Sequence, residues 1–187
     1  MTMDRVFGRP IVTQEEMRTR IRELGRQITA DYADKDLILV GILKGAYAFY
    51  ADLARAIRLP LRVDFLVVTS YGSKPKSSGK VKMVTDLTED IAGRDVLLVE
   101  DIVDSGLTVQ YLIGTLSKRK PKSIEACALL SKPARRKVNV AVRYTGFEIS
   151  DKYVVGYGLD YQQKYRNLPY LAVLDTVDDT GQGIEQG

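Results

Sequence analysis

Hydrophobic residues recur along this chain with two different spacings. After a capping box at Thr13–Glu16, apolar side chains follow one another every three or four positions, which predicts an amphipathic helix that runs to about Ala33. Elsewhere apolar residues stand in uninterrupted runs, of which Leu37–Leu43 is the first, and such runs predict buried strands. The other expected elements are a helix at Ala46–Ile57, strands at Leu61–Thr69, Val81–Leu87 and Val96–Val99, a helix at Val109–Lys118, a strand at Ser123–Leu130, and short strands at Val140–Ile149, Tyr153–Tyr157 and Tyr170–Leu174. Because strands and helices alternate, we predict an α/β fold with a central, mostly parallel sheet flanked by helices.

Two segments interrupt this pattern. Between Tyr71 and Lys82 the chain turns polar and contains two glycines, a proline and four lysines, so we expect a mobile loop, with Tyr71–Lys80 as the natural lid over a site. Residues 178–187 predict a disordered tail. No linker or internal repeat divides the chain, so we expect residues 1–187 to form a single domain.

Composition narrows the class of protein. The chain has 187 residues, 45% of them hydrophobic, which is enough for one sizeable core. The single cysteine, Cys127, lies in an apolar run and is expected to be a buried strand residue. No apolar run approaches the roughly 20 residues that span a membrane, so we expect a cytoplasmic location. Without histidine, acid-base chemistry must come from carboxylates, lysine or tyrosine, and the net charge of +4 fits either a phosphorylated ligand or a nucleic acid.

One continuous segment, Val96–Thr108, carries the clearest chemistry. Four apolar residues lead directly into Glu100 and Asp101, as expected where a buried parallel strand ends at a ligand-binding cleft. The turn Asp104–Thr108 follows, and its glycine, its hydroxyls and the helix behind it are suited to hold a phosphate. The acids can accept hydrogen bonds from the two ring hydroxyls of a ribose. Together these features predict a site for a ribose 5-phosphate.

The turn alone has a simpler interpretation, in which Asp104 or Ser105 caps the following helix. The acidic pair after the strand favours a ligand site instead, and neither a Walker A sequence nor the fingerprint GxGxxG occurs in the chain. Over its whole length the segment resembles the phosphoribosyl diphosphate (PRPP) signature of the type I phosphoribosyltransferases.

Three further clusters have the composition that a PRPP enzyme with a purine pocket needs. Lys44 and Gly45 stand at the end of the first strand and could bind pyrophosphate, although a surface lysine is common there. Ser70 and Tyr71 lead into the lysine-rich loop and by themselves indicate an ordinary surface turn. The third cluster combines a lysine, an aromatic residue and main-chain groups, which would suffice to bind a 6-oxopurine. Its members are Lys132, the segment Lys152–Tyr161 and Arg166.

In this order the four clusters resemble the bacterial-type hypoxanthine-guanine phosphoribosyltransferases from about Leu37 to Leu174. The resemblance implies the type I phosphoribosyltransferase fold, with a small hood built from the terminal segments. It implies a glycosyltransferase of purine salvage that moves the 5-phosphoribosyl group from PRPP to hypoxanthine or guanine, giving IMP or GMP and pyrophosphate. It also implies Mg²⁺ as cofactor and a homodimer or homotetramer that binds small molecules, without a membrane or nucleic acid.

The resemblance further implies a role for each matching residue. Glu100 and Asp101 would hold the ribose hydroxyls, and Asp104 would face N7 of the purine as the catalytic acid-base. The remaining roles would be 5-phosphate binding for Ser105, Gly106, Leu107 and Thr108, pyrophosphate binding for Lys44, Gly45 and Arg166, purine binding for Lys132, Tyr153, Val154 and Asp160, Mg²⁺ binding for Glu100, Asp101 and Asp160, and the lid for Ser70 and Tyr71. Tyr153 stands where Phe or Trp is usual, and Leu107 where some relatives carry a basic residue. The ranking of hypoxanthine, guanine and xanthine therefore stays open.

Two other functions remain open at this point. A regulator like the pyrimidine-operon attenuation proteins keeps the PRPP signature but binds RNA. The basic charge favours that function, whereas the purine pocket from Lys132 to Asp160 counts against it. A transferase for adenine or a pyrimidine would perform the same reaction, but Lys132 is a donor and favours an oxo group at C6.

Overall fold

The computed structural model describes residues 10–71 and 80–174, and a six-stranded sheet runs through it in the order β3-β2-β1-β4-β5-β6. All neighbouring strands are parallel except β3, which is antiparallel to β2. The strands are β1 (Leu37–Leu43), β2 (Arg62–Tyr71), β3 (Lys80–Thr85), β4 (Asp95–Val103), β5 (Ser123–Ser131) and β6 (Tyr144–Glu148). The predicted fold, a mostly parallel sheet flanked by helices, is confirmed.

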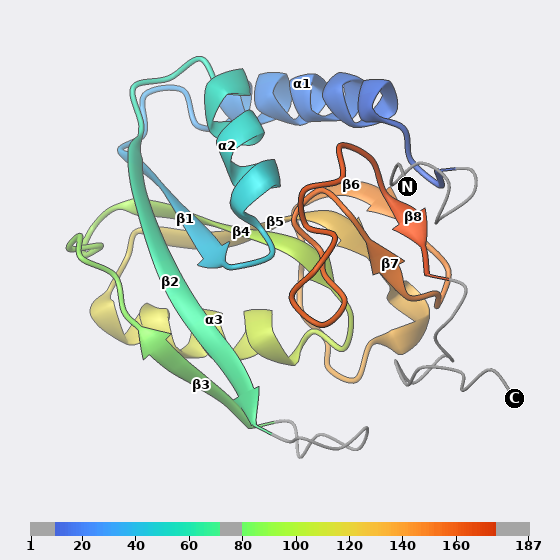
Figure 1. The fold of residues 1–187 in the computed structure, drawn as a ribbon. Helices are drawn as coiled ribbons and strands as arrows, with labels where there is room; N and C mark the ends of the chain where they lie inside the picture. Colours follow the sequence, from blue (N-terminus) through green and yellow to red (C-terminus); the bar gives the residue numbers. More distant parts are fainter. Residues whose placement is uncertain (1–9, 72–79, 175–187) are drawn as a thin grey trace, which may run out of the picture.

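Helices cover both faces of this sheet. Figure 1 shows α1 (Gln14–Asp31) and α2 (Tyr47–Ala56) on one face and α3 (Leu107–Leu116) on the other. The capping box is present, because the Thr13 hydroxyl accepts from the N–H of Glu16 at 3.3 Å and Thr13 N–H donates to the Glu16 carboxylate at 2.7 Å. Two short 3₁₀ helices, η2 (Ser117–Arg119) and η3 (Pro133–Arg135), follow α3 and β5.

The two central strands, β1 and β4, are buried on both faces, as continuous apolar runs require. In β4, Leu97 and Val99 belong to the core under α1 and α2, whereas Val96 and Leu98 belong to the core over α3. Cys127 lies in β5 within the first core, which confirms its prediction as a buried strand residue. Burial there raises the pKa of its thiol.

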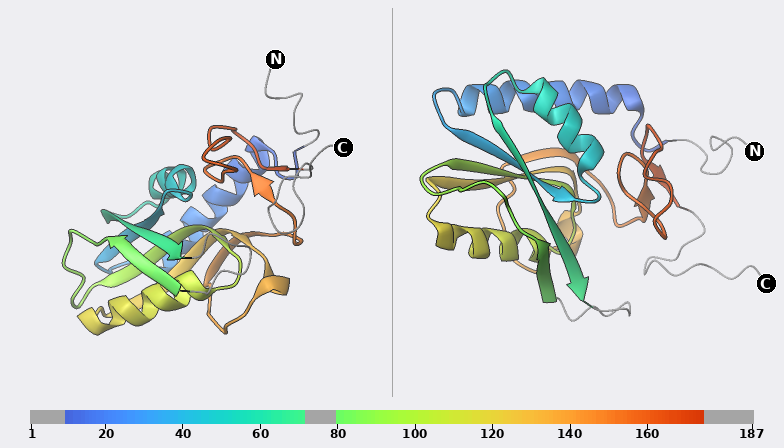
Figure 2. Two further views of the ribbon diagram at one scale, coloured as in Figure 1. Left: turned by 60° about the horizontal axis from the view of Figure 1, so that its bottom comes forward. Right: turned by 60° about the vertical axis from the view of Figure 1, so that its left-hand side comes forward.

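A small antiparallel sheet, β7 (Val154–Val155) with β8 (Ala172–Val173), forms the predicted hood. The N-terminal segment joins it, since Ile11 N–H donates to the carbonyl of Leu171 at 2.9 Å and Leu171 N–H donates to that of Val12 at 3.0 Å. Figures 1 and 2 show the hood beyond the carboxyl ends of the parallel strands, so both terminal segments contribute to that end of the molecule.

The predicted boundaries were wrong in two places that matter for the site. β4 does not end at Val99 but continues to Val103, because β5 pairs with it as far as Ser131. The last third has shorter strands than predicted. β6 begins only at Tyr144, which pairs with Cys127 of β5, and the valines at 140 and 142 pack against a separate core cluster. The other boundaries agree with the expected ones to within about two residues.

Residues 72–79 and 175–187 lie outside the described part of the chain, and with them the predicted loop and tail. Ser70 and Tyr71 end β2, and Tyr71 pairs with Lys80, the first residue of β3. In the described residues, no helix has the length and apolar character needed to cross a membrane.

Candidate active site

The site begins where β4 loses one of its two neighbours. Pairing with β1 ends at Gly41 and Val99, whereas pairing with β5 continues to Val103 and Ser131. From Glu100 onward, β4 therefore has a free side, which faces the turn that follows β1. This places the acidic pair inside a strand and at an opening of the sheet, as expected at the carboxyl edge of an α/β fold.

Gly45 closes this opening from the β1 side. A Cβ atom at Gly45 would lie 1.7 Å from the Asp101 carboxylate, so only glycine allows the backbone to approach this closely. A Cβ at Gly158 in the hood would likewise lie 2.0 Å from the carbonyl oxygen of Gly45. The turn after β1, the end of β4 and the hood thus meet around one carboxylate, with Lys44 beside them at the end of β1.

The pKa values of the two acids, Glu100 and Asp101, are both raised. Burial, together with the charge of Asp101, raises the pKa of Glu100 well above its usual value. Burial also raises the pKa of Asp101, although its contacts with Glu100 and the Ile102 N–H and the charge of Arg166 lower it. One carboxylate oxygen of Glu100, Oε2, is buried without a hydrogen bond. A ribose diol or a hard cation would satisfy that oxygen.

The phosphate turn has its expected shape, but its cap differs from both simpler predictions. Gly106, with φ of +85°, is the N-cap residue of α3 and has no side chain with which to bond, so neither Asp104 nor Ser105 is the N-cap. The Ser105 hydroxyl accepts from the N–H of Leu107, the first residue of the helix, at 3.4 Å. A cavity of about 70 Å³ lies at this helix end, lined by residues 102–106 together with Thr108 and Val109. Uncapped N–H groups and a positive helix end suit a phosphate.

A second cavity, of about 230 Å³, adjoins the turn on the side of the hood. It brings together six residues with a predicted role and three without one. The predicted ones are Asp101, Asp104, Lys132, Tyr153, Val154 and Asp160, and the others are Ile102, Arg135 and Leu159. The Tyr153 hydroxyl donates to the carbonyl of Asp160 at 3.1 Å, and its ring meets that of Tyr161 edge-on at 5.8 Å, which fixes the ring at the wall of the cavity.

Charged side chains surround this cavity in pairs. Lys132 has a side chain only 7% exposed, and its Nζ lies 3.5 Å from Oδ1 of Asp151. Arg135 reaches the same oxygen with Nη1 at 3.2 Å and reaches Asp104 Oδ1 with Nε at 3.4 Å. Neither Arg135 nor Asp151 was predicted as a site residue, because in the sequence they belong to a basic run and to a surface turn.

Arg136 is a third residue that the sequence did not reveal. It donates to the carbonyls of Val103 at 2.7 Å and Asp104 at 2.8 Å, and to the Ser131 hydroxyl at 3.0 Å. Burial lowers its pKa. Arg136 therefore joins the end of β5 to the start of the phosphate turn and holds the backbone that carries Asp104.

Asp160 and Arg166 are bound to each other. Asp160 Oδ1 lies 2.7 Å from Arg166, its Oδ2 accepts from the N–H of Gln163 at 2.7 Å, and Arg166 also donates to the carbonyl of Gly158 at 2.7 Å. Among the described residues, no three acidic or cysteine side chains converge as a metal cluster would require. A Mg²⁺ ion fits the oxygen-only acids at β4 if substrate oxygens and water complete its shell, which is how this ion is commonly held.

A larger cavity, about 410 Å³, lies between α1 and α2 and is lined mainly by arginines and apolar residues of those helices. Of the four predicted clusters, it touches only Tyr157, to which no role was assigned. We therefore place the chemistry at the smaller pair of cavities beside β4.

Comparison with known proteins concerns the family to which the whole chain is similar. The family model described as the phosphoribosyl transferase domain matches residues 10–162. The chain is 49% identical over 171 residues to the hypoxanthine phosphoribosyltransferase of Escherichia coli K12, which covers 90% of this chain and 96% of that protein. It is 50% identical over 171 residues to the hypoxanthine-guanine phosphoribosyltransferase of Mycobacterium avium, with coverage of 88% and 84%. A crystal structure of a hypoxanthine phosphoribosyltransferase from Staphylococcus aureus, 42% identical, matches 92% of this chain and 94% of its own with a TM-score of 0.88.

Proposed function

Since the chain belongs to the phosphoribosyl transferase family, we propose that it transfers the 5-phosphoribosyl group of PRPP to hypoxanthine or guanine. The products would be IMP or GMP and pyrophosphate, as in purine salvage. The observation that carries this proposal is the cavity in which a buried lysine, a tyrosine ring and a carboxylate lie beside the phosphate turn. The names of the relatives from Escherichia coli and Mycobacterium avium support the choice of base.

Three groups would recognise the base. Lys132 carries only donors, so it matches the oxo group at C6 of hypoxanthine or guanine and opposes the amino group of adenine. The Tyr153 ring is at the cavity wall, where it can stack on the base, and the main chain of Val154 can bond to the Watson–Crick edge. These assignments predict recognition of 6-oxopurines as a class, and leave their ranking to measurement.

In the reaction, N9 of the base forms a bond to the anomeric carbon of the ribose as the bond from that carbon to pyrophosphate breaks. The base loses its N7 proton, and Asp104, which lines the cavity, would accept it. Lys44, Arg166 and the backbone at Gly45 would neutralise the leaving pyrophosphate. Water competes for the same carbon, so a lid formed by Tyr71–Lys80 would exclude it.

We propose Mg²⁺ as the cofactor, held by Glu100 and Asp101 at the carboxyl edge of β4. When bound, this ion supplies positive charge to the oxygens of the diphosphate. The buried, unpaired oxygen of Glu100 supports the proposal. Asp160 is the third proposed ligand, and it would exchange its contact with Arg166 for the ion.

We further propose a cytoplasmic homodimer or homotetramer whose only other partners are small molecules. Exposed apolar side chains support self-association: Tyr47 on α2 is 44% exposed, and Val63 and Phe65, which share one face of β2, are 53% and 38% exposed. Light scattering of the purified protein tests this. A monomer at micromolar concentration would contradict it.

A base survey tests the main proposal. The purified protein with PRPP and Mg²⁺ should convert hypoxanthine and guanine to their monophosphates and should convert neither adenine nor uracil. Lys132→Ala should raise the apparent KM for hypoxanthine, since a lost bond to a charged group costs about 1.5–3 kcal/mol. Tight RNA binding without turnover of any purine would favour an RNA-binding regulator instead. Turnover of adenine would contradict the proposed specificity for 6-oxopurines.

A further inference from the structure

Lys132 has a countercharge that none of its proposed roles explains. Its side chain is 7% exposed, and a buried ammonium needs a partner. Among the described residues, Asp151 supplies the only carboxylate within 4 Å, with Oδ1 at 3.5 Å from Nζ. Asp151 comes from the turn between β6 and β7, whereas Lys132 follows β5. The tertiary fold therefore brings this carboxylate to the lysine.

Arg135 extends this pair to the other side of the cavity. Its Nη1 lies 3.2 Å from the same Asp151 oxygen, and its Nε lies 3.4 Å from Oδ1 of Asp104. The four side chains thus alternate in charge, in the order Lys132, Asp151, Arg135, Asp104. Three of them line the cavity of about 230 Å³, and Asp151, which is not a lining residue, contacts both cations.

This order matches one edge of a purine. The oxo group at C6 and the nitrogen N7 are neighbours on the same edge, and the proposed function assigns Lys132 to the first and Asp104 to the second. The two residues must therefore be held at a fixed separation, because a misplacement of about 1 Å can cost 100-fold in rate. The bridge formed by Asp151 and Arg135 provides that separation. The ammonium of Lys132 keeps further N–H groups that can donate to the base.

We propose that Asp151 and Arg135 are positioning residues that fix Lys132 and Asp104 against the O6 and N7 edge of a 6-oxopurine. Asp151 acts through Lys132 and determines selectivity for the oxo group. Arg135 acts on both ends, because it contacts Asp151 and Asp104. The proposal rests on the function proposed above, and its tests are chosen so that the two can fail separately.

Asp151→Asn is the first test. We expect the apparent KM for hypoxanthine to rise roughly tenfold, because the buried ammonium loses its countercharge, with KM for PRPP and the melting temperature close to wild type. Asp151→Glu, which keeps the charge, should recover part of the loss. Glu148→Gln is the matched control, since Glu148 is an exposed carboxylate at the end of β6 on the same segment and should leave all constants unchanged.

A double-mutant cycle with Lys132→Ala separates positioning from folding. If Asp151 acts through Lys132, Asp151→Asn should have no further effect on the purine KM once Lys132 is alanine. Additive losses in the two variants, or an equal rise in KM for PRPP, would show a merely structural role and overturn the inference.

The cycle also distinguishes the two proposals. A raised purine KM in Lys132→Ala with a wild-type value in Asp151→Asn would overturn the inference and leave the function intact. Unchanged purine constants in both variants would remove the assignment of Lys132 itself. For Arg135→Ala we expect both a higher purine KM and a lower kcat, with Arg135→Lys milder in both, and a change in neither constant would exclude Arg135 from the bridge.

Discussion

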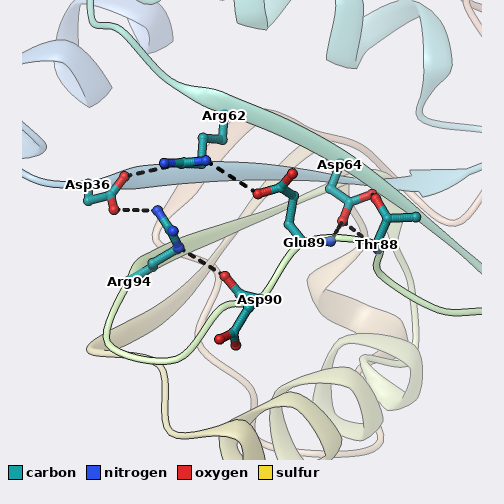
Figure 3. A network of polar contacts seen from close by, with 7 residues as sticks. All are labelled: Asp36, Arg62, Asp64, Thr88, Glu89, Asp90 and Arg94. Carbon is teal, nitrogen blue, oxygen red and sulfur yellow. Dashed lines mark hydrogen bonds and ion pairs between the residues drawn. The ribbon is translucent and has the colours of Figure 1, made fainter.

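The two edges of the parallel sheet differ in how completely the oxygens of their acidic residues are hydrogen-bonded. At the amino edge, near the starts of β1, β2 and β4, the charged groups are paired with one another or with the backbone (Figure 3). Asp64, only 6% exposed, accepts from the backbone N–H groups of Thr88 and Glu89, each at 2.8 Å, from that of Phe65 at 2.7 Å, and from the Thr88 hydroxyl at 3.2 Å. Arg62 lies 3.7 Å from Asp36.

At the carboxyl edge, oxygens are left over. Glu100 Oε2 and Asp104 Oδ1 are buried without a hydrogen bond, and the latter has only the longer contact with Arg135. Such groups cost free energy in the unliganded protein, so the presence of two of them at this edge indicates binding rather than stability. We therefore expect that substitutions at the carboxyl edge lower the activity without lowering the free energy of unfolding. Substitutions at the amino edge should lower the free energy of unfolding without lowering the activity.

The largest effect is expected for Asp104→Asn. Asparagine keeps the shape but cannot accept the N7 proton, so kcat should fall roughly 100- to 10,000-fold, the range for a positioned acid-base group. Gly106 caps α3, so no helix cap is lost and the melting temperature should stay within a few degrees of wild type. Steady-state assays with hypoxanthine and a thermal melt check this. Near-normal turnover would mean that another group handles the proton.

Asp64→Ala should give the opposite result. Three backbone N–H groups lose the buried carboxylate that accepts from them, and we expect a loss of about 3 kcal/mol in the free energy of unfolding, with kcat for hypoxanthine unchanged. Asp90→Ala is the control, because the Asp90 carboxylate is exposed and accepts from the N–H of Ala92 alone. Urea unfolding measures the loss. A lower kcat for Asp64→Ala under conditions where the variant is fully folded would contradict the proposed difference between the two edges.

Gly45→Ala tests how closely the carboxyl edge is packed. The added methyl group would overlap the Asp101 carboxylate, so either the turn or the acid must shift, and we expect a fall of about 100-fold in kcat/KM for PRPP. Gly114→Ala provides the control, because a Cβ at that position in α3 meets nothing within 4 Å and should stabilise the helix by up to about 1 kcal/mol. Equal activity of the two variants would contradict the close approach at Gly45.

The same contrast separates what could be predicted from the sequence from what could not. The sheet, its helices and the segment from Glu100 to Thr108 follow from local periodicity and from residues adjacent in the chain. The extension of β4 past Val99 depends on how far β5 runs beside it, which no local pattern states. Arg135 and Asp151 are absent from the prediction for a related reason.

Their partners are distant in sequence. Arg135 meets Asp104 and Asp151 only because the ends of β4 and β5 and the turn after β6 are brought to one place. Arg136 likewise bonds to carbonyls at the end of β4 and the start of the phosphate turn. A basic run after a strand gives no sign of such contacts, since most runs of this kind are solvated.

Tyr32 is an exception to this contrast between the two edges, because it lies outside the candidate site and still has an unpaired oxygen. Its hydroxyl, at the end of α1, is the third buried side-chain atom without a hydrogen bond in the described residues, and no ligand site lies there. If the hydroxyl is only a cost, Tyr32→Phe should leave kcat unchanged and raise the free energy of unfolding at pH 8 by up to about 1 kcal/mol.

The effect should depend on pH in a stated direction. Burial raises the pKa of Tyr32 to about 12, so between pH 10 and 12 the unfolded chain loses this proton while the folded chain keeps it, and stability falls as pH rises. The wild type should therefore lose about 1.4 kcal/mol per pH unit in this window through Tyr32, and Tyr32→Phe should lack that part of the loss. Urea unfolding of both proteins at pH 8, 10 and 11 measures the difference, from which the contributions of the other buried tyrosines cancel. Parallel pH profiles would show that water solvates the Tyr32 hydroxyl in the folded protein, and the unpaired oxygens would then be confined to the carboxyl edge.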